Sequence, residues 1–407
     1  MRRSLQFATL GFSCWIAACG GEPSGPIDSL PRPLTAAEEQ LVASGNAFAF
    51  DLFHQVVAET DPGANMFVSP LSVAMALGMT LNGAAGETET AMRSALRLNT
   101  LTGEDANRSF RDLIDLLTTL DRRVEFAIGN SVWAREGYAF EPAFLDVARQ
   151  FFDARVEALD FDAPEAAAAI NAWVDEQTRG RIPEIVPDAL PSDVVMYLIN
   201  AIYFKGDWTQ PFDIAQTTDR SFHLASGGSA DVPTMAHGAP IEVRSGRGDG
   251  VTVLELPYAR GAFSMVVVVP DEGSSIEAMI DDIGIATWGG WQDLLHDGEA
   301  LIHLPRFSYS FEVTLNDALA ALGMGVAFSG SADFTRLSPD GGLFIDEVKH
   351  KAFVEVDEEG TEAAAATSVS MAVSVPPIIE VNRPFLFVLR ERFSGTVLFL
   401  GRVMDPR

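Results

Sequence analysis

The sequence predicts an α+β protein in one large domain, and two observations lead to this. Apolar residues repeat at helical spacing early in the chain, whereas later they alternate or form unbroken runs of strand length. The 407 residues are 47% hydrophobic, which is enough for a large core, and no repeat or internal linker divides them. We therefore expect helices first and strands later, with helices recurring between strands, in a single domain over residues 35–407.

The predicted domain begins with a helix at Thr35. Residues 35–38 form a capping box, in which the Thr35 hydroxyl and the Glu38 carboxylate satisfy the first helical N–H groups. Apolar residues then follow on one helical face as far as Val56. Pro164 stands where a first-turn proline belongs, so it predicts another helix start. Further helices are expected over residues 72–81, 86–98, 105–120, 141–152 and 313–322.

Strand patterns dominate the second half of the chain. The run VVMYLINAIYFKG at residues 194–206 is almost wholly apolar and predicts a strand that is buried on both faces. Residues 124–134 alternate and predict an earlier strand. Short strands and turns are expected over residues 215–310. Strands return at residues 344–356, 378–390 and 396–403.

The N-terminus resembles an export signal. Arg2 and Arg3 precede an apolar stretch, and residues 16–19, Ile-Ala-Ala-Cys, resemble a bacterial lipobox, whose cysteine becomes the lipidated first residue. We expect a signal peptide over residues 1–18 and lipidation at Cys19; a plain secretory signal or a coincidental cysteine is the alternative. Gly and Pro predict a flexible tether over residues 19–34. The protein is then exported, as a bacterial envelope lipoprotein (outer membrane or surface) or an extracellular protein.

Composition and motifs exclude several functions. A formal net charge of -29 disfavours nucleic acid and anionic membranes as partners. The expected lipid anchor would then be the chain's contact with a membrane. We expect the protein to be a monomer. The six histidines have no metal-ligand spacing, and no nucleophile elbow or phosphate-binding loop occurs. Cys14 lies within the expected signal, so the mature chain forms no disulfide. We expect neither an enzyme nor a bound cofactor or metal.

One segment, EEGTEAAAATSVSMAVSVPP at residues 358–377, looks like a linker but alternates like a strand. Its second face is polar or small throughout, and its first face is small at the start and apolar later. Alanine is a poor strand former, and two prolines end any ladder there. The pattern suits a loop that enters a sheet conditionally, although composition alone favours an ordinary surface loop. The first face carries Thr361, Ala363, Ala365, Thr367, Val369, Met371 and Val373.

Several stretches of the chain resemble the serpins, a family of serine protease inhibitors with a mobile reactive loop. The matching stretches are residues 65–88, 170–182, 198–212, 348–367 and 382–406. The resemblance implies three β-sheets, about nine helices and an exposed reactive-centre loop in a metastable native state. It implies an irreversible suicide inhibitor of serine proteases, with cysteine proteases as a further class. A serpin fold used only for binding or as a surface protein is the alternative.

The resemblance also assigns the parts of the loop. The implied hinge comprises Glu358, Glu359, Gly360, Thr361, Glu362, Ala363, Ala364, Ala365, Ala366 and Thr367. Counting back from the prolines places the cleaved bond at Val373-Ser374, which we favour. Counting forward from the hinge places it at Ser374-Val375, and Met371-Ala372 is a third candidate. No Arg or Lys occurs between Lys351 and Arg383, so we expect an elastase-, subtilisin- or chymotrypsin-like target rather than a trypsin-like one.

A polar cluster beneath the main sheet is implied as well. Its members would be Ser69, Ser72, Asn200 and His350, whose hydrogen bonds rearrange when the sheet opens. Plain buried polar packing is the alternative for Ser69. His350, between Lys349 and Lys351 at the start of a strand, is expected to be structural rather than catalytic.

Overall fold

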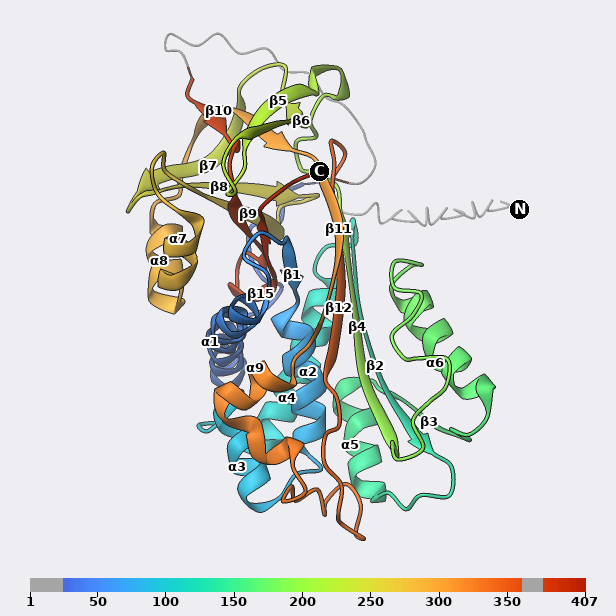
Figure 1. Ribbon diagram of the computed structural model, residues 1–407. Coiled ribbons are helices and arrows are strands. Elements are labelled where there is room, and N and C mark those ends of the chain that lie inside the picture. Colours follow the sequence, from blue (N-terminus) through green and yellow to red (C-terminus); the bar gives the residue numbers. More distant parts are fainter. Residues whose placement is uncertain (1–24, 361–375) are drawn as a thin grey trace, which may run out of the picture.

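The computed structural model describes residues 25–360 and 376–407, and it confirms an α+β fold (Figure 1). In these residues there are nine α-helices and three sheets, as expected. The helices are α1 (Ala36–Glu59), α2 (Pro70–Leu81), α3 (Gly86–Ala95), α4 (Gly103–Thr119), α5 (Pro142–Phe152), α6 (Pro164–Gln177), α7 (Ile276–Asp282), α8 (Ile285–Asp293) and α9 (Asn316–Leu319).

The strands form one large sheet and two small ones. The large sheet has the order β1-β15-β14-β9-β8-β7-β10-β6-β5, with β13 on β10; the small sheets are β3-β2-β4 and β11-β12. The strands are β1 (Met66–Val68), β2 (Val124–Arg135), β3 (Arg155–Leu159), β4 (Met196–Gly206), β5 (Thr218–His223), β6 (Ser229–Ala236), β7 (Ile241–Gly248), β8 (Val251–Tyr258), β9 (Phe263–Pro270), β10 (His296–Pro305), β11 (Phe307–Thr314), β12 (Lys349–Val356), β13 (Ile378–Glu380), β14 (Phe385–Glu391) and β15 (Val397–Val403).

Helix α1 begins where its capping box predicts. The Glu38 N–H donates to the Thr35 hydroxyl at 3.3 Å, and the Thr35 N–H donates to the Glu38 carboxylate at 2.6 Å. The two side chains thus accept hydrogen bonds from backbone N–H groups that have no partner within the helix. The upstream residues contact the domain too, since the Ile27 N–H donates to the Arg260 carbonyl at 2.8 Å and the Arg260 Nε donates to the Gly25 carbonyl at 2.8 Å.

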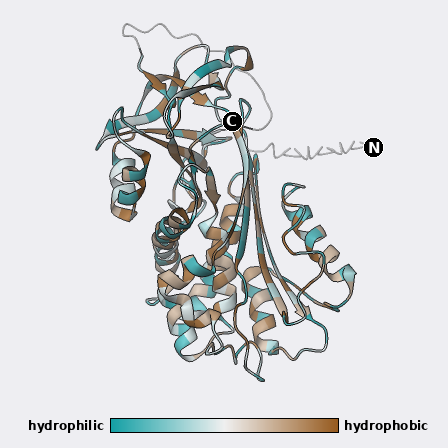
Figure 2. Cartoon of the chain, in the orientation of Figure 1, coloured by the Kyte–Doolittle hydropathy of each residue, from teal (hydrophilic) through white to brown (hydrophobic). Residues whose placement is uncertain are grey.

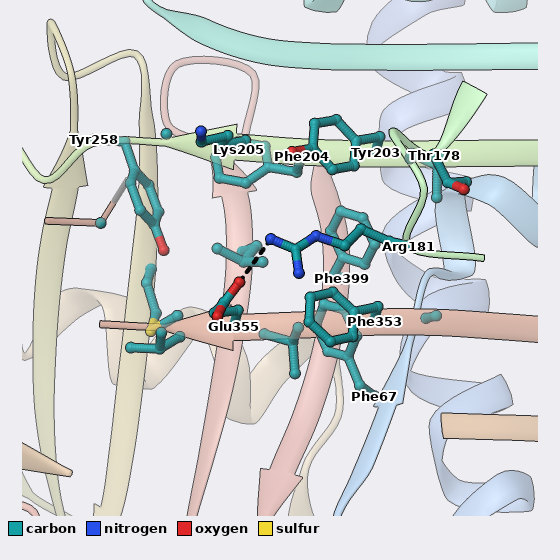
Figure 3. A pocket seen from close by; sticks show the side chains of 18 of the residues that line it. Phe67, Thr178, Arg181, Tyr203, Phe204, Lys205, Tyr258, Phe353, Glu355 and Phe399 are labelled. Carbon is teal, nitrogen blue, oxygen red and sulfur yellow. Dashed lines mark hydrogen bonds and ion pairs between the residues drawn. The ribbon is translucent and has the colours of Figure 1, made fainter. Parts of the chain in front are cut away.

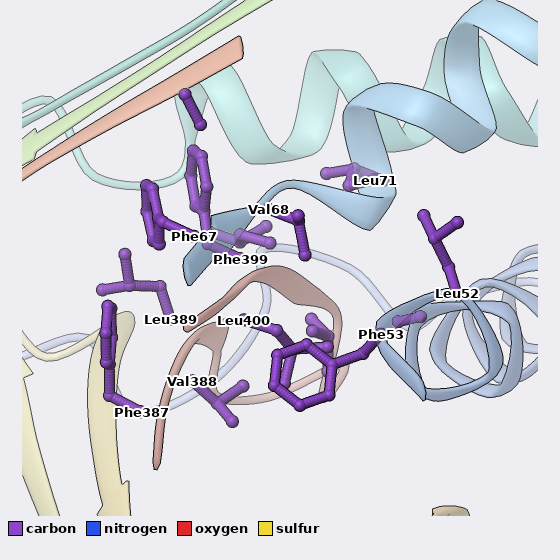
Figure 4. Close-up of a cluster of buried hydrophobic side chains, with 14 of the residues drawn as sticks. Leu52, Phe53, Phe67, Val68, Leu71, Phe387, Val388, Leu389, Phe399 and Leu400 are labelled. Carbon is purple, nitrogen blue, oxygen red and sulfur yellow. The ribbon is translucent and has the colours of Figure 1, made fainter. Parts of the chain in front are cut away.

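The main core lies between the large sheet and the helices. Phe67 of β1 stacks on Phe399 of β15 with ring centroids 4.8 Å apart, and Phe387 of β14 lies 5.6 Å from Phe67 (Figure 4). Leu52 and Phe53 of α1 close the same cluster from the helical side. Hydrophobic residues gather in the middle of the molecule, and hydrophilic residues lie on its outer parts (Figure 2).

Some expected elements differ from the observed ones. Two short helices, α7 and α8, lie in the span expected to hold only strands and turns. Helix α8 contains Gly289 and Gly290, which weaken the helical signal, whereas Ser275 caps α7 in the usual way. Strand β11 runs to Thr314, so the helix expected from residue 313 begins at Asn316. The strand expected over 344–356 begins at Lys349.

The two small sheets lie next to each other with β4 and β12 at their facing edges (Figure 1). Within the described residues, β4 pairs with β2 and β12 pairs with β11, and β4 and β12 are not paired by backbone hydrogen bonds. This explains why the prediction of a doubly buried strand at 194–206 is only partly right. Only three of the eleven residues of β4 are buried and the others are partly exposed.

Candidate functional site: a gap between two strands

A cavity of about 750 Å³, part of it open to solvent, lies between β4 and β12 (Figure 3). Tyr203 to Gly206 line it from β4, and Ala352 to Val356 line it from β12. Successive strands of a sheet are joined by N–H and C=O groups along their edges. The cavity therefore separates two strand edges that one additional strand could join.

The floor of this gap is apolar. Phe67, Met265, Leu389 and Phe399 line it from the large sheet below. Phe67 and Phe399 are the stacked pair of the main core, so the floor is rigid and already packed on its far side. A strand that entered here would bury apolar side chains against the floor at about 25 cal/mol per Å² of apolar surface.

The outer face of the gap is crossed by the segment that follows α6. The Arg181 guanidinium pairs with the Glu355 carboxylate of β12 at 2.8 Å (Figure 3). The same guanidinium lies over the Phe353 ring, 4.7 Å from its centroid. Two residues before Phe353 in the strand, the Lys351 ammonium donates to the Glu184 carbonyl at 3.3 Å. The segment thus contacts β12 at two places.

One end of the gap is closed by the first residues of the expected hinge. The Trp208 N–H donates to the Glu359 carbonyl at 3.1 Å, and the Phe212 N–H donates to the Glu358 carbonyl at 2.9 Å. The Trp208 ring stacks on Tyr258 with centroids 4.4 Å apart, and its Nε1 donates to the Asp357 carbonyl at 2.9 Å. The segment after β4 and the segment after β12 therefore meet at this end.

The Glu358 side chain is buried at this closed end. It is 4% exposed, and the Thr217 hydroxyl donates to one of its oxygens at 2.5 Å. The Arg306 guanidinium lies 3.4 Å from the other oxygen. A carboxylate this deeply buried needs such partners, since an unpaired one would be costly. Burial also raises the pKa of the neighbouring Asp357, and the nearby acidic groups add to this.

Gly360 is required by its place in the structure. Its φ is +73°, in the left-handed region that favours glycine. A Cβ there would lie 2.2 Å from the Trp208 backbone nitrogen, a distance that real side chains do not adopt. Gly360 belongs to the hinge that the family resemblance implies, and the structure shows a close backbone approach there that excludes any side chain.

Three of the four residues expected to form a polar cluster lie together. The Ser69 N–H donates to His350 Nε2 at 3.0 Å, the Ser69 hydroxyl donates to the Leu398 carbonyl at 2.8 Å, and the Ser72 N–H donates to Ser69 Oγ at 3.2 Å. Ser69 is also the N-cap of α2. These bonds link β12, α2 and β15.

His350 is neutral in this arrangement. Its Nε2 accepts a hydrogen bond from a backbone N–H, so the ring proton is on Nδ1. Burial lowers the pKa of His350 to about 4. Its imidazole is therefore uncharged at neutral pH, and protonation would remove its bond to Ser69.

Asn200, the fourth residue of the expected cluster, makes its hydrogen bond to Asn130 and not to the other three. Its side-chain amide donates to the Asn130 oxygen at 2.7 Å, and the Asn130 amide donates to the Phe152 carbonyl at 2.7 Å. Within the described residues its own buried oxygen has no hydrogen-bond partner. The sequence-implied cluster is thus divided between the two strands that border the gap.

The rest of the expected loop lies outside the described residues. This applies to Thr361 through Thr367 of the hinge, to the candidate bonds at residues 371–375, and to Cys19. The chain is described again from Pro376, and β13 pairs in parallel with β10. In the described ranges no group of His, Cys, Asp or Glu could hold a metal ion, and no helix there is long and apolar enough to cross a membrane.

Comparison with known proteins identifies the family. The family described as "Serpin (serine protease inhibitor)" matches residues 43–406. The chain is 36% identical over 380 residues to the pig (Sus scrofa) leukocyte elastase inhibitor and 32% identical over 378 residues to human Serpin B9. Each match covers 90% of this chain and 100% of the relative. The chain therefore belongs to the serpin family.

Solved structures agree with this assignment. The thermophilic serpin tengpin in its native state has a TM-score of 0.81 at 29% identity, covering 94% of this chain and 97% of that one. Human thyroxine-binding globulin in complex with thyroxine has a TM-score of 0.82 at 30% identity, covering 91% and 100%. Proteins named as inhibitors and a thyroxine-binding globulin thus both occur among the similar proteins.

Several residues of the site were not identified from the sequence. Arg181, Glu355, Arg306 and Thr217 are ordinary surface residue types, and their partners lie far away in the chain. Arg181 is separated from Glu355 by 174 positions. No local pattern reports such a pairing. Trp208, like Arg181 and Glu355, lies in a stretch that resembles the family, but only its large ring near a strand end was a local signal.

Proposed function

We propose that this protein is an irreversible inhibitor of serine proteases that works by inserting its cleaved loop between β4 and β12. The observation that carries the proposal is the gap itself, with two unjoined strand edges, an apolar floor and the hinge bound at one end. Residues 361–373 at about 3.3 Å per residue span roughly 40 Å, so full insertion carries an attached protease by a distance on that order.

The chemistry belongs to the attacking protease. Its serine oxygen attacks the carbonyl carbon of the residue before the cleaved bond, which we place at Val373. The hydroxyl proton passes to the protease histidine and then to the amine of Ser374, which leaves as the new N-terminus. The protease is then held as an ester on Val373. Water releases it unless insertion displaces and distorts the protease first, and the chain itself contributes no catalytic group.

The alternation of the loop fits the gap. One face of residues 361–373 starts with small residues and continues with Val369, Met371 and Val373, which suits the apolar floor. In an extended strand Glu362, the one charge in this run, would lie on the opposite face. With no Arg or Lys at 371–375, the proposed targets are elastase-, subtilisin- or chymotrypsin-like enzymes. The names of two relatives as leukocyte elastase inhibitors support this choice.

The test uses the full-length protein with pancreatic elastase. We expect a covalent complex that survives SDS, with a new N-terminus at Ser374 in the released peptide. Thr361→Arg places a charge on the inward face and should convert the protein into a substrate that is cut without complex formation. Glu362→Arg, one residue away on the outward face, is the matched control and should still form the complex. Cleavage of the wild-type protein with no complex against a panel of serine proteases would contradict the proposal.

A binding role without trapping is the second candidate, because thyroxine-binding globulin has the same fold. In that case cutting the loop would yield no covalent complex and no gain in heat stability. The same elastase experiment, followed by thermal denaturation of the cut protein, separates the two functions.

We also propose that the protein is exported and anchored by a lipid at Cys19. The support is the pattern at residues 2–19, with two arginines, an apolar stretch and the Ile-Ala-Ala-Cys motif. The anchor would keep the inhibitor at a bacterial envelope. Cys19→Ser should abolish labelling by a fatty acid and shift the protein from the detergent phase to the aqueous phase. Unchanged partitioning would favour a plain secretory signal.

A further inference from the structure

We propose that the ion pair between Arg181 and Glu355, which we call the Arg181–Glu355 bridge, sets the rate at which β4 and β12 separate to admit a strand. This inference rests on the proposed function, since it concerns the same gap. It assigns control of the opening rate to two residues that contact neither the protease nor the cleaved bond. This rate determines both how fast a cut loop is inserted and how readily an uncut loop inserts prematurely.

Helix α6 is firmly attached to the β4 side of the gap. Its Trp173 packs edge-on against Trp133 of β2, with centroids 6.0 Å apart (Figure 1 shows the helix beside β2). Gly129 of β2 allows the helix to approach closely, since a Cβ there would lie 2.8 Å from the Gln177 side-chain oxygen. Ile199 and Ala201 of β4 belong to the same small core. Helix α6 must therefore move with β2 and β4.

The segment after α6 is fixed to the helix at both of its ends. The Ile182 N–H donates to the Thr178 hydroxyl at 3.0 Å. The Asn171 side-chain oxygen accepts from the N–H groups of Ile185 at 2.9 Å and Val186 at 3.0 Å. Arg181 thus projects from a braced segment and not from a free loop, and its position follows that of β4.

Glu355 belongs to the other side of the gap. It lies on the outward face of β12, whose register pairs it with Ser308 of β11. The bridge at 2.8 Å, the stacking of Arg181 on Phe353 and the Lys351 contact to the Glu184 carbonyl all join the braced segment to this strand (Figure 3). They are contacts between two bodies that must separate.

Insertion is incompatible with the bridge as it stands. Neighbouring strands lie about 4.8 Å apart, so making room for one more strand widens a strand-to-strand gap by a distance of that order. An ion pair at 2.8 Å does not survive such a displacement while α6 stays on β4. The bridge must break during the opening, and the free energy it contributes is then part of the opening barrier.

The expected size of the effect is moderate. Both side chains are about two-fifths exposed, so solvent screens the pair, and the stacking on Phe353 adds to it. We expect removal of the bridge to speed opening by about three- to tenfold. Faster opening favours trapping of a cut loop over hydrolysis of the ester. It also shortens the lifetime of the uncut form, because an uncut loop can then enter too.

The experiment measures opening without a protease. The uncut full-length protein is incubated with a synthetic peptide of residues 361–373, and peptide uptake is followed by native gel electrophoresis over time. The variants are Arg181→Gln, Glu355→Gln and the double variant. Glu125→Gln is the matched control. Glu125 of β2 pairs with Arg179 at 3.8 Å, and both residues lie on the β4 side, so this ion pair does not cross the gap.

We expect uptake to be three- to tenfold faster in both single variants. The gain should be larger for Arg181→Gln, which also loses the stacking on Phe353. The double variant should show no gain beyond that of Arg181→Gln, and Glu125→Gln should show no change. Raising the salt concentration should speed uptake in the wild type and not in the variants, because it screens the bridge. Equal uptake rates in all proteins, or a salt response that persists in the double variant, would contradict the proposed role of the bridge. No uptake by any of them would overturn it as well. The proposed function fails on a different result, the absence of a covalent complex with the wild-type protein.

Discussion

Strands β9 and β4 are both almost wholly apolar in sequence, yet their surroundings differ. All eight residues of β9 are buried, and the strand lies between β8 and β14. Only three of the eleven residues of β4 are buried, and in the described residues β2 is its only sheet neighbour. In the described residues β9 has a neighbour on each edge, whereas β4, whose composition is typical of a strand buried on both faces, has a neighbour on one edge. The difference indicates that the sequence of β4 is suited to a second arrangement.

The largest effect is expected in the large sheet. Phe387→Ala removes a fully buried ring that packs on Phe67, Phe307 and Phe385, so we expect a loss of about 3–5 kcal/mol in the free energy of unfolding. The urea midpoint of the uncut protein measures this. Phe344→Ala, at an exposed ring, is the control and should change little. A loss below about 1 kcal/mol for Phe387→Ala would contradict the rigid core described above.

Acid should affect the gap more than the large sheet, through His350. The native state keeps this ring neutral down to a pKa of about 4, whereas the unfolded chain takes up a proton near 6.5. Stability is therefore lost as the pH falls from 6.5 to 4, by up to about 3 kcal/mol.

Unfolding midpoints between pH 7 and 4 test this, with His350→Asn as the variant that should lose most of the pH dependence. His223→Asn, at an exposed histidine, should retain it. A pH dependence that is equal in both variants would show that other groups cause it.

Gly360→Ala should weaken the closed end of the gap by about 1–3 kcal/mol, because the new Cβ meets the Trp208 backbone and the φ is positive. Gly227→Ala is a matched control with a φ of +87° and open space around it, so it reports the backbone strain alone. Unfolding midpoints of the two variants measure the difference. Equal losses would mean that the close approach to Trp208 contributes nothing.

The smallest effect is expected at Glu358. Thr217→Val removes the hydrogen bond to this buried carboxylate and should cost about 1–2 kcal/mol, measured again as a shift in the unfolding midpoint. Thr209→Val, whose hydroxyl donates to the Ala259 carbonyl at an exposed site, is the control and should cost less. An unchanged midpoint for Thr217→Val would indicate that Arg306 alone stabilises Glu358.

Local signals predicted most of the fold. The capping box at Thr35, the proline at 164 and the apolar run of β4 each identified an element, because each depends on neighbours within a few residues. The helices α7 and α8 were missed because they are short and α8 contains two glycines. Family-like stretches supplied the overall arrangement, which periodicity alone does not give.

The site was less predictable than the fold. Ser69, Ser72 and His350 come together as the family resemblance implies, and Asn200 lies on the other strand. The partners of Glu355 and Glu358 depend on tertiary contacts, so no pattern in the sequence reports them. In the described residues β4 and β12 are not paired with each other. The sequence could not predict this, because both segments have the composition of strands and the pairing depends on the fold.

Thermal denaturation before and after one cut at residues 371–375 tests the central claim most directly. If the cut loop enters the gap, β4 and β12 each gain a hydrogen-bonded neighbour and the floor is covered, so the melting temperature should rise. Thr361→Arg, cut at the same bond, should show no such rise. A melting temperature that stays the same or falls after cleavage of the wild-type protein would contradict the insertion of the loop between these two strands.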